Sequence, residues 1–302
     1  MPVRFKIKTA SGCRSLQDAT YSDEVMILIT ALSVKIPEQR RGIRGWADRL
    51  RGDRVQVNLL RARGVTLRHV IYTSYSGEVK LEKADEAVGM QRGRLLCSDR
   101  LEFPPRSGYK RFSSAAFSSR LCTNFALSVL DGGQADVRVA LYDPDAACAD
   151  LLPHLLAYCG DVTAVTDCFE PYLCAADRAL EELGAAAVIT RRREELSACG
   201  LVIAPRPVRE PLPLCEKAVV LTAGKPLVSL SGTVLWRYHF KMPNGFADIK
   251  PEELSEEYFC SALYTLGSQF ELGSIVPLSA QGERGSCDAK ALAAILGANN
   301  RD

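Results

Sequence analysis

Short apolar segments alternate with helical segments through the second half of the chain, and this alternation constrains the fold more than any other feature. The strand-like segments are 137–142, 162–166, 186–190, 201–204, 218–221 and 226–230. Helical apolar spacing covers residues 113–130, 146–158, 171–183 and 191–197. Apolar strands joined by helices are typical of βαβ units in a parallel sheet that is buried on both faces. Because such crossovers are right-handed, the sequence predicts a doubly wound parallel α/β sheet.

The first part of the chain has a different pattern, typical of a small α+β domain. Its strand-like stretches are 3–8, 25–32 (a strand or a short helix), 55–60, 66–74 and 79–81, with Gly64 and Gly77 as turns. Pro104 and Pro105 cannot continue a helix or a central strand, so they mark a boundary. We therefore expect a small basic α+β domain over 1–105, the α/β domain over 106–280 and a C-terminal tail over 281–302. A late helix is predicted over 251–266, with Pro251 in its first turn.

The composition is that of a globular protein. The 302 residues are 47% hydrophobic and 25% charged, and the mean hydropathy is −0.02. No apolar run reaches the roughly 18 residues of a membrane helix, so no membrane partner is expected. The N-terminus carries no apolar signal core, and the eleven cysteines fall singly rather than at metal or redox spacing. These features predict a cytoplasmic protein with reduced thiols.

The net charge of +2 hides an uneven distribution. Residues 1–111 hold 22 Lys and Arg against 12 Asp and Glu, and the remainder holds 16 against 24. Six arginines gather with a tryptophan that could stack on bases: Arg40, Arg41, Arg44, Arg49, Arg51, Arg54 and Trp46. Acidic residues are interleaved with them, which favours a solvated face over a nucleic-acid site. Nucleic acid is therefore not an expected partner, whereas attraction between the two charged parts leaves a homo-oligomer open.

The long helix over 113–130, the alternating elements after it and the late helix resemble the Rossmann-like nucleotide domain of amino-acid dehydrogenase-like proteins, such as shikimate dehydrogenase. That resemblance implies a catalytic α/β domain first, a nucleotide domain second, and NAD or NADP as the cofactor. It also places a glycine-rich G-x-G-x-x-G turn after the first strand, where backbone amides hold the pyrophosphate. In this chain the turn is Asp143-Pro144-Asp145-Ala146-Ala147-Cys148. It has no glycine, and its two carboxylates would repel a pyrophosphate.

Four residues are candidates for cofactor or ligand binding: Asp143, Asp145, Asp167 and Thr222. All four follow or end predicted strands, and the carboxyl ends of parallel strands form the ligand edge of such a sheet. Asp167 lies about twenty residues after the first turn, where the ribose-binding acid of an NAD site falls. It also precedes a predicted helix, so an N-cap or a turn is the alternative. The alternative for Thr222 is a simple turn.

Asp143-Pro144-Asp145 also resembles the D-x-D motif of haloacid-dehalogenase-type phosphatases. That resemblance implies Asp143 as nucleophile, Asp145 as general acid/base and a Mg²⁺ ion between them. No strand end supplies the acidic pair that would complete the metal site, and His69, His154 and His239 have no metal-ligand spacing. We therefore expect no metal site.

Three functional hypotheses follow from these patterns. The first is a nucleotide- or dinucleotide-binding, oxidoreductase-like protein with a small-molecule ligand at the sheet edge. The second is a non-catalytic Rossmann-like binding or assembly module. The third is a Mg²⁺-dependent phosphatase. The sequence identifies no catalytic residue and does not decide whether the chain is an enzyme.

Overall fold

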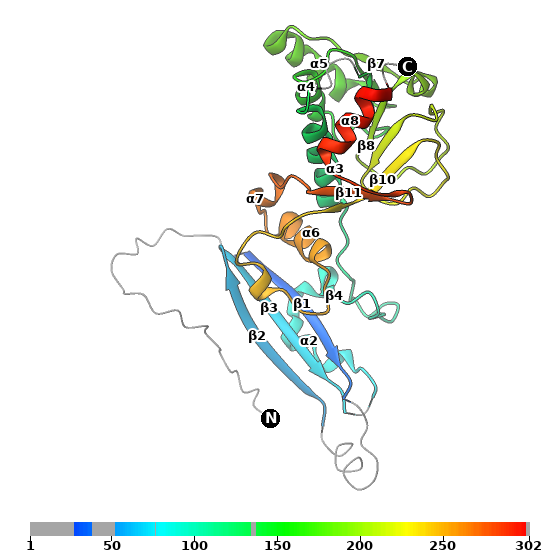
Figure 1. Cartoon of the computed structure of the whole chain (residues 1–302). Helices are drawn as coiled ribbons and strands as arrows, with labels where there is room; N and C mark the ends of the chain where they lie inside the picture. Colours follow the sequence, from blue (N-terminus) through cyan, green and yellow to red (C-terminus); the bar gives the residue numbers. More distant parts are fainter. Residues whose placement is uncertain (1–26, 38–51, 76, 134–136, 300–302) are drawn as a thin grey trace. The chain divides into compact units, whose positions relative to one another are not determined.

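The computed structural model describes residues 27–37, 52–75, 77–133 and 137–299. The chain forms two compact units (Figure 1). The first comprises Met1–Ser114 and Met242–Gln269, and the second comprises Ala115–Lys241 and Phe270–Asp302. These units differ from the expected ranges because residues 242–269 return to the first unit and the C-terminal segment is part of the second. The strand expected over 3–8 and most of the arginine cluster lie outside the described residues.

The first unit is built on a four-stranded sheet of order β2-β3-β1-β4. Its strands are β1 (Ile27–Lys35), β2 (Arg54–Ala62), β3 (Val65–Thr73) and β4 (Leu96–Cys97). β1 is parallel to β3 and β4, whereas β2 and β3 form an antiparallel hairpin. The hairpin turns at Arg63 and Gly64, with φ of 47° and 78°. Two positive φ angles are typical of a type I′ turn, whose twist matches the strands.

Short helices follow β3 in the first unit. They are η1 (Leu81–Lys83), α2 (Asp85–Val88) and η2 (Gly89–Arg94). Val88, Tyr109 and Leu95 pack with Leu32 and Tyr72 of the sheet in one apolar cluster. The strand predicted over 79–81 is therefore wrong: Leu81 begins η1, and its apolar side chain packs against this cluster.

The segment 242–269 contributes η4 (Ala247–Ile249), which contacts β2, and α6 (Glu256–Leu266), which contacts β1. α6 begins five residues later than predicted. Its N-cap is Ser255, whose hydroxyl oxygen accepts a hydrogen bond from the Tyr258 amide at 3.3 Å. A serine at this position satisfies a free amide of the first turn, which Pro251 cannot do. Phe259 and Leu263 of α6 are fully buried.

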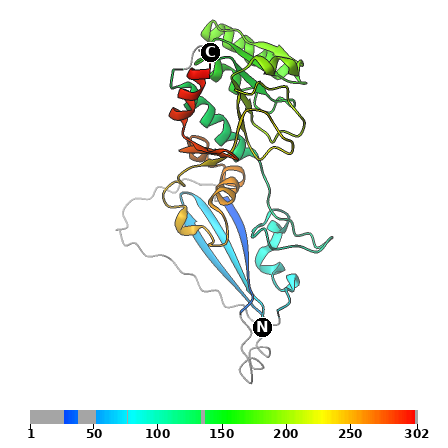
Figure 2. The ribbon, with the colours of Figure 1, turned by 45° about the vertical axis from the view of Figure 1, so that its right-hand side comes forward.

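The second unit has an eight-stranded sheet (Figures 1 and 2). Its strands are β5 (Val139–Tyr142), β6 (Val162–Val165), β7 (Val188–Thr190), β8 (Leu201–Ala204), β9 (Val219–Thr222), β10 (Thr233–His239), β11 (Ser279–Gly282) and β12 (Gly285–Cys287). The order is β7-β6-β5-β8-β9-β10-β11-β12. The first six of these are parallel, and β11 and β12 are antiparallel. Counted from β5, the parallel strands follow the order 3-2-1-4-5-6 of a Rossmann fold. The predicted fold class, an N-terminal α+β unit followed by a Rossmann-like parallel sheet, is confirmed.

One layer on this sheet is helical. Its helices are α3 (Ala116–Leu130), α4 (Leu151–Leu156) and α5 (Phe169–Leu183). α3 contacts β8, β9, β10 and α4, and α4 contacts β6 and α5, so the three form a continuous layer. A separate apolar cluster joins Tyr142 and Val202 of the sheet to Leu196, Val208 and Leu212. Leu196 belongs to η3 (Arg193–Ala198), whereas the other two lie in loops, so no long helix contributes to that cluster.

Three predicted elements of the second unit change. The helix predicted over 146–158 is shorter, because residues 146–150 lie outside it and α4 begins only at Leu151. The sixth parallel strand is β10 and not 226–230, because Gly232 turns the chain immediately before it. The expected tail instead forms α7 (Phe270–Gly273), the β11–β12 hairpin and α8 (Ala289–Asn299), which packs on α3. In the described part of the chain no helix is long and apolar enough to cross a membrane.

Candidate functional site

The order of the parallel strands reverses between β5 and β8, so this pair defines the switch point of the sheet. In open α/β sheets, ligands bind outside the carboxyl ends of the strands at such a point. Four residues follow or end strands here: Asp143 and Asp145 after β5, Asp167 after β6, and Thr222 at the end of β9. Because these strands are parallel, the structure brings all four to one edge of the sheet.

Asp143 is buried, with 1% of its surface exposed. Its Oδ2 accepts hydrogen bonds from the Cys148 amide at 2.7 Å and from the Tyr172 hydroxyl at 2.9 Å. Burial, together with the neighbouring Asp143 charge, raises the pKa of Tyr172 far above its usual range. The hydroxyl is therefore a permanent donor to the carboxylate. The Asp143 carboxylate thus accepts hydrogen bonds inside the turn, as the phosphate of a bound ligand does in a glycine-rich turn.

The backbone of the turn closes around this carboxylate. The Ala146 amide donates to the Asp143 carbonyl oxygen at 3.1 Å, and Ala146 has a φ of 52°. Non-glycine residues seldom adopt this left-handed conformation, so the turn is held by its surroundings. The Cys148 amide, which sits where the last glycine of G-x-G-x-x-G falls, is already occupied. The β5 turn thus offers no glycine and no free Cys148 amide to a pyrophosphate.

Asp145 forms an ion pair with Arg206, which follows β8. The Arg206 Nη1 lies 2.5 Å from Asp145 Oδ2, and the side chains are 53% and 67% exposed. The pair links the β5 turn to the β8 turn across the switch point. An exposed pair of this kind contributes about 0–1 kcal/mol to stability, so its main effect is to neutralise the Asp145 charge at the edge.

Thr222 is fully buried, and its hydroxyl points back into the protein. The Oγ1 lies 2.9 Å from the Arg206 carbonyl oxygen and 3.2 Å from that of Gly224. The Thr222 carbonyl oxygen accepts from the Tyr238 hydroxyl at 3.0 Å. These bonds fix the loops after β8 and β9. They leave Thr222 a positioning role at the edge rather than direct contact with a ligand.

Asp167 differs from the other three because its side chain is exposed and accepts no hydrogen bond from the described residues, although its charge acts on nearby Arg193. Its amide donates to the Pro144 carbonyl oxygen at 3.1 Å, and its carbonyl oxygen accepts from Arg191 Nη2 at 3.3 Å. Among the described residues, no donor is hydrogen-bonded to its carboxylate. The N-cap of α5 is Cys168, and no side chain caps that helix. The structure thus places Asp167 at the end of β6 with a carboxylate directed to solvent.

Basic side chains lie beside Asp167. The Arg191 guanidinium is 4.8 Å from the centre of the Phe169 ring, a cation–π distance. Arg193 also lies close enough for its charge to interact with that of Asp167, and Arg192, between them in sequence, is exposed. A carboxylate beside guanidinium groups offers acceptors for sugar hydroxyls and donors for a phosphate.

Sequence reasoning missed a second network at the same edge. Tyr142 donates its hydroxyl to Glu210 Oε1 at 2.5 Å, and Arg193 Nη1 lies 2.6 Å from Glu210 Oε2. The Tyr142 hydrogen bond, aided by Arg193, lowers the pKa of Glu210 against the effect of its partial burial. Burial, followed by the Glu210 charge, raises the pKa of Tyr142. No local motif signals this network, because Glu210 lies 68 residues after Tyr142.

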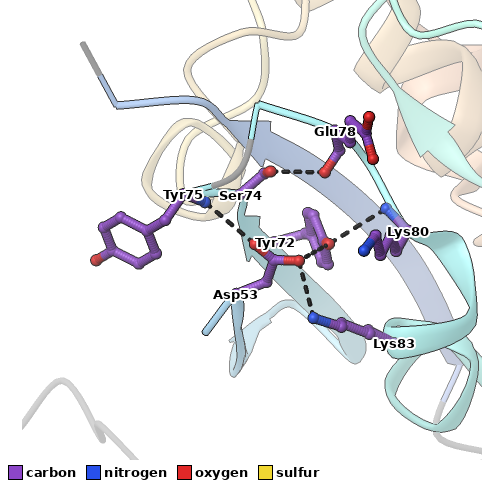
Figure 3. Close-up of polar contacts among 7 residues, drawn as sticks. All are labelled: Asp53, Tyr72, Ser74, Tyr75, Glu78, Lys80 and Lys83. Carbon is purple, nitrogen blue, oxygen red and sulfur yellow. Dashed lines mark hydrogen bonds and ion pairs between the residues drawn. The ribbon is translucent and has the colours of Figure 1, made fainter. Parts of the chain in front are cut away.

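The first unit holds a polar cluster of its own around Asp53 (Figure 3). The Asp53 side chain is almost fully buried. Asp53 accepts hydrogen bonds from the Tyr72 hydroxyl at 2.8 Å, Lys83 Nζ at 2.9 Å and the Tyr75 amide at 3.1 Å. Burial alone would raise the pKa of Asp53, but these bonds outweigh it and lower the pKa to about 2. The Tyr72 hydroxyl also accepts from the Lys80 amide at 3.2 Å. The cluster fastens the ends of β2 and β3 to the segment before η1.

Two of the three histidines, His69 and His239, contact polar side chains of neighbouring elements. His69 Nε2 lies 2.5 Å from the Ser33 hydroxyl, which also donates to Glu253. Burial lowers the pKa of His69, although the nearby Glu253 charge opposes this. His239 is 3.2 Å from Gln281 on the neighbouring strand. Among the residues that the structure describes, no group of three histidine, cysteine or acidic side chains is arranged to hold a metal ion.

Comparison with known proteins adds little to this geometry. No protein-family model matches the chain, and no curated protein matches its sequence. A similar solved structure is the crystal structure of L-tryptophan dehydrogenase from Nostoc punctiforme, which is 12% identical with a TM-score of 0.29. The alignment covers 90% of this chain and 88% of that one. At this TM-score the likeness carries no argument, so the Rossmann-like assignment of the second unit rests on its strand order.

Proposed function

We propose that the second unit binds a nucleotide at the carboxyl edge of its sheet, on the β6–β7 side of the switch point. The observation that carries the proposal is the exposed Asp167 carboxylate at the end of β6, which accepts no hydrogen bond within the described part of the chain. A carboxylate at that position accepts hydrogen bonds from ribose hydroxyls in dinucleotide folds. Arg191 and Arg192 supply positive charge for a phosphate beside the ribose.

NAD and NADP fit this edge only in part. The Asp167 carboxylate supplies a hydrogen-bond acceptor for the ribose. The pyrophosphate lacks the Cys148 amide as a donor, because that amide is already hydrogen-bonded to Asp143. We therefore derive no hydride transfer from this site. A nucleotide held through its ribose and a phosphate near Arg191 satisfies the side chains better than a dinucleotide clamped at the β5 turn.

The test is thermal unfolding of the full chain with ATP, ADP, NAD⁺, NADH, NADP⁺ and NADPH. A ligand at a hundred times its dissociation constant adds about 2.7 kcal/mol to the free energy of unfolding. We expect a saturable shift with at least one of these nucleotides, and its loss in Asp167→Ala. Asp177→Ala, which removes another exposed carboxylate from α5, is the matched control and should keep the shift.

A specific observation favours a second candidate, the non-catalytic binding or assembly module. The β5 turn is filled by the Asp143 carboxylate, as expected if the sheet serves as a scaffold and has no phosphate to hold. Absence of a saturable shift with all six nucleotides would reject nucleotide binding and favour this module.

The phosphatase hypothesis finds less support at the same turn. Asp143 is buried with two donors on one oxygen, and Asp145 is paired with Arg206 rather than available to Mg²⁺. Hydrolysis of p-nitrophenyl phosphate that needs Mg²⁺ and disappears in Asp143→Asn would revive it.

A further inference from the structure

α5 carries an apolar stripe that takes no part in the core. The helix packs on the unit through Tyr172, Ala175 and Ala179, which are buried. A second row has the alternating three- and four-residue intervals of a coiled-coil seam: Leu173, Ala176, Leu180 and Leu183. Its leucines are 52%, 56% and 47% exposed. Three large apolar side chains aligned on one face differ from the scattered exposed residues of an ordinary surface.

The stripe lies on the flank of α5 away from α4. Arg178 reaches Asp150 at the start of α4 with a distance of 3.4 Å, so it marks the flank that faces α4. At 100° per residue, the leucines and Arg178 fall on opposite sides of the buried row. Phe169, which is in line with the stripe, contacts Arg191 just after β7. The leucines therefore face toward the β7 end of the sheet.

β7 itself is the terminal strand of that end. In the described part of the chain it pairs with β6 alone, so its other edge has no strand partner. Val188 of β7 is 55% exposed. A free strand edge beside apolar side chains is a template for pairing with another chain. We call the stripe and this strand the α5–β7 surface, defined by Leu173, Ala176, Leu180, Leu183 and Val188.

Charges before and after β7 indicate which chain fits. Glu181 and Glu182 lie in the last turn of α5, which precedes the strand, and Arg191 and Arg192 directly follow it; all four are exposed. If two copies of β7 pair antiparallel, the acidic end of one meets the basic end of the other. A two-fold axis produces this arrangement, because the same patch then contacts itself. A parallel arrangement would instead place like charges together.

We propose that the α5–β7 surface binds a second copy of this chain across a two-fold axis. The two β7 strands pair antiparallel and join the two sheets, and the two α5 stripes pack against each other. Glu182 of each copy lies near the partner's Arg192. The five residues that define the surface do not include Asp167, and only Arg192 is shared between this interface and the proposed nucleotide site.

The primary test is the mass of the full chain in solution, measured by sedimentation equilibrium over a range of concentrations. The wild type should have twice the 33.0 kDa mass of the chain. Leu180→Glu and Val188→Lys should each raise the dimer dissociation constant by roughly 30-fold or more, because they place a charge in the buried centre. Leu227→Glu is the matched control: Leu227 is 73% exposed in the same unit but lies outside the surface, so this variant should remain dimeric.

A charge exchange tests the antiparallel arrangement. Glu182→Arg should weaken the dimer, and adding Arg192→Glu to the same chain should restore it, because each position then meets its opposite again. Circular dichroism and thermal unfolding of every variant confirm that it is folded. A wild type that stays monomeric at about 100 µM, within the range of ordinary dimers, would overturn the proposal. So would a dimer that Leu180→Glu and Val188→Lys leave intact, or a failure of the charge exchange to restore binding.

Discussion

At the scale of single residues, the first strand–helix turn of the second unit shows how a carboxylate takes the place of a bound anion. A glycine-rich turn leaves its amides free so that a phosphate can complete their hydrogen bonds. Here the Asp143 carboxylate accepts the hydrogen bond of the Cys148 amide, and the Tyr172 hydroxyl of α5 donates a second hydrogen bond to it. The same aspartate that removes the phosphate site therefore ties the turn to the helix beyond β6.

Removal of that carboxylate should destabilise the protein. Asp143→Ala leaves the Cys148 amide and the Tyr172 hydroxyl without their acceptor, and each unsatisfied buried donor costs about 1–3 kcal/mol. Urea unfolding should show a loss of that order or more. Asp145→Ala is the control, because its ion pair is exposed and the loss should stay below about 1 kcal/mol. Equal losses in the two variants would show that Asp143 has no special structural role.

Asp53 should make the stability depend on pH. Its pKa is lowered from 3.8 to about 2 in the folded chain, so protonation opposes folding. The contribution is present in full above about pH 4 and is lost as the pH falls toward 2, by an amount on the order of 2 kcal/mol. The difference in unfolding free energy between wild type and Asp53→Asn should shrink over this range. Asp161→Asn, which breaks the exposed pair with Arg138, is the control, and its difference from wild type should change little with pH. If the difference in unfolding free energy for Asp53→Asn is also independent of pH, the expectation is wrong.

At the scale of elements, local signals located some boundaries well. The strand predicted over 201–204 is β8, and α5 ends at Gly184, whose φ of 65° is the left-handed cap that glycine favours. Elements whose limits depend on distant partners were missed. The sequence predicts the sixth strand over 226–230, but pairing with β9 selects Thr233–His239 instead. A single sequence carries no signal of that pairing.

The sixth parallel strand, β10, begins directly after a turn at Gly232. The φ of Gly232 is 84°, and a Cβ there would lie 2.2 Å from the Ala218 carbonyl oxygen. Gly232→Ala should therefore cost at least about 2 kcal/mol, through both the close contact and the strained conformation. Gly160→Ala is the control, since nothing lies within 4 Å of its added carbon. Urea unfolding of both variants checks the expectation, and similar midpoints would contradict it.

In the candidate site, too, the positions of the residues follow from the sequence but their roles do not. Parallel strands predict that Asp143, Asp145, Asp167 and Thr222 share one edge, because their positions follow from strand order alone. What each side chain does there depends on partners far along the chain. Arg206, which neutralises Asp145, lies 61 residues after it. Only such contacts distinguish Asp167, whose carboxylate accepts no hydrogen bond from the described residues, from the three neighbours whose side chains are hydrogen-bonded or ion-paired.

At the scale of the whole molecule, the chain leaves the first unit, builds most of the second, and returns with residues 242–269 before completing the second. The returning segment carries fully buried apolar side chains, among them Phe246, Phe259 and Leu263. α6 contacts β1, and η4 contacts β2. The first unit therefore depends on residues that follow it by more than a hundred positions, a dependence that linear domain boundaries do not reveal.

Phe259→Ala tests this dependence. Loss of a buried phenylalanine costs about 3–5 kcal/mol, and the loss should fall on the first unit. Hydrogen exchange of the full chain should show faster exchange in β1 and β3, while β5 and β8 keep their protection. Phe125→Ala, which removes an equally buried ring from α3, should give the opposite pattern. If both variants speed exchange equally throughout the chain, the two units unfold as one; if Phe259→Ala spares β1, the returning segment does not support the first sheet.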